Sequence, residues 1–152
     1  MQSCYVSVIV GVDAGLVESS VEEVVQLEDR IVSQSRALLP AGSQDQIRQG
    51  LEDFNKILRP LGLETQLVVL SRANSIALFF LCMTLSAIMS LRELWLTLRL
   101  RGIVQSLFSF LSHSTDRWGR TRGVVVKRLS WPLNDYERCC AFFRTLQGKQ
   151  TI

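Results

Sequence analysis

The chain has few of the residues from which catalytic and metal sites are built. It contains one histidine, His113, only three prolines, and four cysteines of which no two form a C-x-x-C pair. Zinc sites and thiol redox sites depend on such pairs or on clustered histidines. His113 has no cysteine or aspartate at a useful spacing, and nothing marks a nucleophile. We therefore expect no enzyme, no cofactor and no metal.

The cysteines also bear on the compartment. Cys139 and Cys140 are adjacent, which suits neither a zinc site nor a simple bridge. Cys82 lies in an apolar run, where cysteine behaves as a small hydrophobic residue. The start of the chain, Met1–Tyr5, lacks the basic region and apolar core of a secretory signal. A reducing, cytoplasmic location is the expectation.

Charge is scarce but unevenly distributed. Charged residues make up 20% of the 152 positions and hydrophobic residues 47%, which is typical of one globular domain spanning 1–152. Residues 1–64 hold ten acids and five bases, whereas residues 65–152 hold four acids and twelve bases. This asymmetry favours either an anionic partner or an ordinary solvated basic surface next to acidic helix starts.

Four segments have the composition of strands. The first, CYVSVIV at 4–10, is rich in β-branched residues, and Val6, Val8 and Val10 would share one face. TQLVVLSR at 65–72 and SIALFFLC at 75–82 are separated by Ala73 and Asn74, which predicts a hairpin. GVVVKRL at 123–129 is the fourth.

Helical periodicity occupies the segments between these strands. Apolar residues recur at helical spacing over 15–39, 43–59 and 85–111, with Gly102 as the expected kink or break in the last. Asn134 is the expected cap of a final helix from Asp135 to about Leu146. The order βααββαβα predicts an α+β, ferredoxin-like α/β sandwich: a four-stranded antiparallel sheet with helices on one face.

Two alternatives come from local composition. Nineteen uncharged residues at 73–91 approach the length of a membrane-spanning helix, or represent a buried strand followed by a core helix. The segment Arg117–Arg122 combines bases with Trp118, as in sites that bind nucleic acid by charge and stacking. The strand at 75–82, however, lacks the basic and aromatic pattern on which RNA-recognition domains stack bases. Both functions are therefore secondary hypotheses.

One strand indicates binding. In residues 75–82 both alternating sets are apolar, so Phe79 and its neighbours point outward if helices cover only one face of the sheet. An exposed apolar patch with a polar rim usually marks a site for a partner protein. The same pattern also arises when another helix or domain covers that face.

Residues 75–143 resemble the N-terminal domain of the tumour-necrosis-factor-receptor death-domain adaptor TRADD and its relatives. The similar elements are the strand Ser75–Cys82, Leu94-Trp95, Arg101-Gly102, Leu107, Val124-Val125-Val126, Asn134–Cys139, and the earlier Val17–Val21 with Val24-Val25. Two departures stand out: Val17–Ser20 lies several residues beyond the first strand, and Leu96, Leu98 and Leu100 alternate where polar residues are expected.

The resemblance implies a non-catalytic adaptor domain of cytoplasmic signalling and apoptosis. Its family binds the trimeric domain of TNF-receptor-associated factors through an open sheet face and uses no cofactor. Carried over by strand alternation, that face would present Tyr5, Ser7, Phe79, Val125 and Lys127 to a partner protein.

Overall fold

The four expected strands form one antiparallel sheet. In the computed structural model, which describes residues 3–13, 21–38, 48–72, 75–112 and 124–150, the strands stand in the order β2-β3-β1-β4. Their bounds are Cys4–Asp13 for β1, Thr65–Arg72 for β2, Ile76–Cys82 for β3 and Val125–Ser130 for β4. This is the strand order of a ferredoxin-like α/β sandwich, so the predicted fold class and the predicted hairpin are confirmed.

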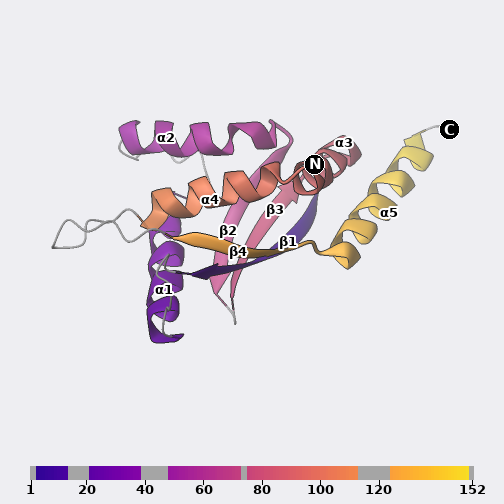
Figure 1. Cartoon of the computed structure of the whole chain (residues 1–152). Coiled ribbons are helices and arrows are strands. Elements are labelled where there is room, and N and C mark those ends of the chain that lie inside the picture. Colours follow the sequence, from indigo (N-terminus) through magenta and orange to yellow (C-terminus); the bar gives the residue numbers. More distant parts are fainter. Residues whose placement is uncertain (1–2, 14–20, 39–47, 73–74, 113–123, 151–152) are drawn as a thin grey trace.

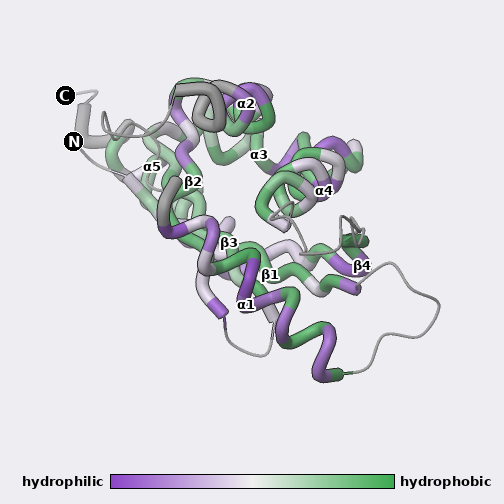
Figure 2. The backbone as a smooth tube through the Cα atoms, turned by 90° about the vertical axis from the view of Figure 1, so that its left-hand side faces the viewer, coloured by the Kyte–Doolittle hydropathy of each residue, from purple (hydrophilic) through white to green (hydrophobic). Residues whose placement is uncertain are grey.

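The helices lie between and after the strands. They are α1 (Val21–Leu38), α2 (Arg48–Leu58), α3 (Leu85–Leu96), α4 (Arg99–Ser112) and α5 (Leu133–Gln150), with a short 3₁₀ turn at Arg59–Leu61. Helices α2, α3 and α4 lie together on one side of the strands (Figures 1 and 2). Phe54 of α2 and Phe110 of α4 place their ring centroids 6.0 Å apart, so α2 packs on α4.

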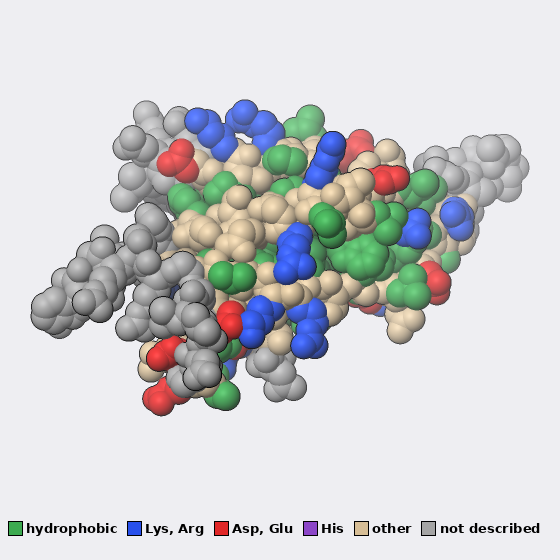
Figure 3. All heavy atoms as spheres, in the orientation of Figure 1, with side chains coloured by type: hydrophobic (Ala, Val, Ile, Leu, Met, Phe, Trp, Pro, Cys, Tyr) green, Lys and Arg blue, Asp and Glu red, His purple; other side chains and the backbone are tan. Residues whose placement is uncertain are grey.

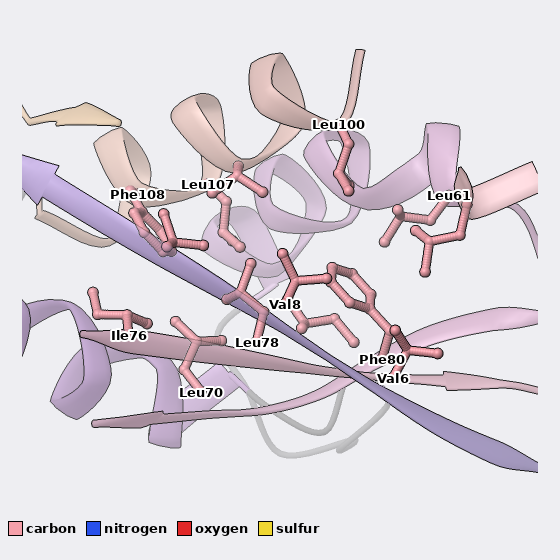
Figure 4. Close-up of a cluster of buried hydrophobic side chains, with 14 of the residues drawn as sticks. Val6, Val8, Leu61, Leu70, Ile76, Leu78, Phe80, Leu100, Leu107 and Phe108 are labelled. Atoms are coloured by element: carbon pink, nitrogen blue, oxygen red, sulfur yellow. The ribbon is translucent and has the colours of Figure 1, made fainter. Parts of the chain in front are cut away.

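Alternation along the strands decides which face is buried. Val6, Val8, Val10 and Val12 of β1 all point to the helix side, and all are buried. They meet side chains from β2, β3 and the helices; the core includes Leu61, Leu70, Ile76, Leu78, Phe80, Leu100, Leu107 and Phe108 (Figure 4). Most of the apolar surface that stabilises the fold is therefore buried between the sheet and the helices.

The segment predicted as one helix over 85–111 is two helices. Thr84 caps α3, because its side chain accepts a hydrogen bond from the Ala87 amide at 3.0 Å. The helix ends at Leu96, and Leu98 takes the left-handed conformation with φ 65°. The expected break at Gly102 was wrong: Gly102 lies inside α4, and a Cβ there would meet nothing within 4 Å.

The uncharged run at 73–91 does not form a single helix. From Ile76 to Cys82 it is the strand β3, and from Leu85 it is the beginning of α3. In the described ranges, no helix is long and apolar enough to cross a membrane. The buried strand followed by a core helix is the alternative that fits this segment.

Helix α1 lies on the helix side of the sheet and carries a buried acid. Arg72, at the end of β2, is 2.9 Å from Asp29 of α1, and Glu28 beside it is buried. Burial raises the pKa of the Glu28 carboxyl above its usual value, although the nearby Arg72 guanidinium lowers it and Asp29 raises it further.

This shift makes the contribution of Glu28 dependent on pH. Because the folded state favours the protonated carboxyl, stability falls as pH rises from the unfolded pKa through the folded pKa. We expect Glu28→Gln to raise the free energy of unfolding at pH 7 by about 1 kcal/mol, with a smaller gain at pH 4. Urea unfolding at both pH values tests this, with Glu137→Gln on the exposed side of α5 as the control. A loss of stability at pH 7 would show that attraction to Arg72 outweighs the burial cost.

Candidate protein-binding face

The side of the sheet away from the core presents a set of half-exposed side chains, all of them apolar except Ser7. We call this the open face and define it by Tyr5, Ser7 and Ile9 of β1, Val69 of β2, Phe79 and Leu81 of β3, and Val125 of β4. The exposed fractions are 51% for Tyr5, 42% for Ile9, 42% for Val69 and 45% for Val125. Phe79, Leu81 and Ser7 are half-buried by their neighbours.

Strand pairing brings three of the five predicted residues together. Ser7 lies opposite Phe79, and Phe79 lies opposite Val69. Ser7, Phe79 and Val69, which was not among the predicted residues, therefore form one row across three strands. Tyr5 lies opposite Leu81 in the next row. Directly opposed side chains on one face have Cβ atoms about 5 Å apart. Tyr5, Ser7 and Phe79 are therefore neighbours in one apolar cluster.

The other two predicted residues lie at the far end of β1. Val125 pairs with Asp13, eight residues from Tyr5, which is about 26 Å along a strand. The Lys127 ammonium is 2.7 Å from an Asp13 carboxylate oxygen. Val125 and Lys127 thus belong to the same face but not to the Tyr5–Phe79 cluster, and the Lys127–Asp13 ion pair forms a charged rim at β4.

Reasoning from sequence missed part of this face. Ile9 continues the alternation of Tyr5 and Ser7, so the period of two could have identified it. Val69 reaches the open face because the register of β2 shifts between Leu67 and Val69, and composition carries no sign of that shift. Arg128 lies opposite Gly11 and is exposed, also after a register shift. Figure 3 shows Lys and Arg side chains beside β4, with hydrophobic side chains towards α5.

Side chains of α4 form hydrogen bonds with the backbone groups at the outer edge of β4. The Gln105 amide of α4 donates to the Val124 carbonyl at 2.6 Å and accepts from the Val126 amide at 2.9 Å. Arg101 donates to the carbonyls of Val126 and Lys127 at 2.8 and 3.0 Å. An edge whose donors and acceptors are already satisfied is a poor template for a further strand.

Helix α5 occupies the edge of β1 where β4 has ended. The Ser7 amide donates to the Asp135 carboxylate at 3.1 Å, and Arg138 donates to the Tyr5 carbonyl at 3.1 Å. Asp135 and Arg138 are themselves 3.3 Å apart. A partner that uses Tyr5 and Ser7 therefore meets their side chains on the open face and not a free strand edge.

Two of the four cysteines form a disulfide, contrary to expectation. Cys4 at the start of β1 and Cys139 of α5 form a disulfide across 135 residues, with their Cα atoms 5.7 Å apart. The expectation that Cys139-Cys140 suits no simple bridge was wrong, because the chain brings Cys139 against the first strand. Cys140 and Cys82 are buried thiols, and burial raises the pKa of Cys82 to about 11 despite a hydrogen bond with Thr65. Such a thiol stays protonated and unreactive at neutral pH.

The structure does not support the other sites considered from the sequence. His113 and the basic segment Arg117–Arg122 fall outside the described residues. Within the part of the chain that the structure describes, no three histidine, cysteine, aspartate or glutamate side chains group closely enough to hold a metal ion.

Comparison of the chain with protein-family models, with curated proteins and with solved structures found no match.

Proposed function

We propose that this chain is a non-catalytic protein-interaction domain that holds a partner protein on the open face. The observation that carries the proposal is the row Val69–Phe79–Ser7, flanked by Tyr5 and Ile9, on a side of the sheet opposite the core. Half-exposed apolar side chains grouped in this way usually mark an interface. Tyr5 and Phe79 are the expected anchors, since aromatic residues dominate binding energy at interfaces.

The surroundings of this cluster support binding through the face. The described edges of β1 and β4 are occupied by α5 and α4, which disfavours addition of a strand at those positions. Lys127 and Arg128 lie at the β4 end of the face. Basic rim residues fix the orientation of a partner with acidic groups at its own rim.

The resemblance to the TRADD N-terminal domain suggests what the partner is. It favours the trimeric domain of a TNF-receptor-associated factor and an adaptor role in cytoplasmic signalling, including apoptosis. The cytoplasmic location belongs to this proposal. A reducing cytosol keeps thiols reduced, so in that compartment Cys4 and Cys139, which the structure shows bonded, would be thiols.

The test is calorimetric titration of the purified chain with the trimer domain of a TNF-receptor-associated factor. We expect saturable binding that Phe79→Asp removes, since a carboxylate at the centre of the apolar cluster would be buried without a partner. Leu63→Asp is the matched control: Leu63 is fully exposed and lies outside the open face, so this variant should bind like the unchanged chain.

The outcomes test the location of the interface and the class of partner separately. Equal binding by Phe79→Asp and Leu63→Asp would place the interface away from the open face. No heat with any variant would reject this class of partner. Circular dichroism of Phe79→Asp must match that of the unchanged chain; an unfolded variant would show that Phe79 supports the core.

A further inference from the structure

Helix α3 carries apolar side chains on two of its sides. Ala87, Ile88 and Leu91 are buried against the rest of the fold. On its outer side Met89 and Leu96 remain 49% and 50% exposed. A helix at the surface normally has one apolar side and one polar side. The outer apolar residues of α3 are therefore in excess of what its own fold requires, and the sequence shows this as the unexpected leucines that follow Leu94.

Two opposite charges lie in the middle of this outer side. Arg92 and Glu93 are both exposed, and with Met89 and Leu96 they occupy positions i, i+3, i+4 and i+7, which share one face of a helix. We call these four residues the α3 stripe. All four line a surface groove of about 640 Å³, whose other walls include Pro60, Leu85 and Tyr136.

The α3 stripe is complementary to a second copy of itself that runs in the opposite direction. When two copies of a helix pair antiparallel about a two-fold axis between Arg92 and Glu93, residue 92 of one meets residue 93 of the other. Residue 89 then meets residue 96. Each arginine thus faces a glutamate and each Met89 faces a Leu96, in both halves of the contact. An interface of this two-fold kind requires such self-complementarity.

We propose that a second copy of this chain occupies the groove, with α3 of each copy packed antiparallel on α3 of the other. A copy of α3 brings Met89 and Leu96 to cover the same residues of its partner, and two Arg92–Glu93 ion pairs set the register. Arg92 already lies over the Tyr136 ring at 5.3 Å, and a planar guanidinium is able to stack on a ring and pair with a carboxylate together.

The size of the contact predicts a weak dimer. Twelve residues make a helix of about 18 Å, and a helix of that length gives less than the 1,200 Å² or so of a standard interface unless the groove walls contribute. We expect a dissociation constant of micromolar order.

Dimerisation at α3 leaves the open face available. Helix α3 lies on the helix side of the sheet with α2 and α4, whereas the open face is on the other side (Figure 2). Each dimer then presents two open faces, which raises avidity for a multivalent partner. The dimer proposal does not depend on the open face being a binding site.

Sedimentation equilibrium of the full chain at about 1 to 500 μM tests the proposal. Arg92→Glu places four acids at the centre of the contact, and Glu93→Arg places four bases there. Each variant alone should raise the dimer dissociation constant at least tenfold, because like charges are brought together. The double variant Arg92→Glu with Glu93→Arg restores opposite charges and should recover the dimer.

Mixing the two single variants gives the sharpest result. The two adjacent acids of an Arg92→Glu chain then face the two adjacent bases of a Glu93→Arg chain, so an equimolar mixture should dimerise while each component stays monomeric. A chain that is monomeric at 500 μM overturns the proposal. So does a dimer that the single variants leave unchanged, or a mixture that does not associate; a monomer that instead binds a helical peptide would assign the groove to another protein.

Discussion

Phe80→Ala is expected to lower the free energy of unfolding by about 3–5 kcal/mol, whereas Phe79→Ala lowers it by about 1 kcal/mol or less. The two phenylalanines are adjacent in β3 but point to opposite sides of the sheet. Phe80 is 1% exposed and belongs to the core, while Phe79 is half-buried on the open face. Each variant removes the same atoms, so the pair isolates the effect of position.

The physical reason is the cavity that truncation leaves in the core. Phe80 lies opposite Val6 on one side and Leu67 on the other, and both neighbours are buried. Both neighbours are packed in the core between the sheet and the helices, where Figure 4 shows Val6 beside Phe80, so they cannot close fully over the lost ring. At Phe79 water fills the space instead.

Urea unfolding followed by circular dichroism measures both differences. Equal losses from the two variants would mean that Phe79 is as buried as Phe80, and the open face would then be covered by part of the molecule. The prediction thus also tests the premise of the proposed binding site by a method that needs no partner.

Cys139→Ser is expected to lower the free energy of unfolding by about 2–5 kcal/mol under oxidising conditions. The bond from Cys4 to Cys139 closes a loop of 135 residues, nearly the whole chain. Breaking it returns conformational freedom to the unfolded state, and the gain is larger for a longer loop. It also frees α5, whose contacts with β1 include the hydrogen bonds of Asp135 and Arg138.

Adding a reductant distinguishes the effect of losing the disulfide from the effect of replacing the Cys139 side chain. Dithiothreitol should destabilise the unchanged chain to nearly the level of Cys139→Ser, and it should have little effect on that variant. Cys140→Ser is the neighbouring control, because it replaces a buried thiol that makes no bridge. If dithiothreitol leaves the unchanged chain as stable as before, the bridge does not contribute to stability in solution.

The sequence by itself determined the four strands and the buried side of the first one. Alternation of valine over residues 4–10 and the two apolar runs at 65–72 and 75–82 are local patterns, and a period of two follows directly from backbone geometry. The order of strands and helices then left few antiparallel arrangements, of which the ferredoxin-like sandwich is the simplest. Alternation also placed Tyr5 and Ser7 on one face, and the resemblance added Phe79 to it.

Only the tertiary structure decided the features that depend on distant residues. The disulfide joins Cys4 to Cys139 because α5 folds back along β1, and no spacing rule predicts which cysteines meet. Val69 joins the open face through a register shift that is set by pairing with β3. The break at Leu98 was missed because the leucines on either side continue a helical period. The exposed side of α3 was equally hidden, since hydrophobicity marks a residue for burial but does not say which surface will cover it.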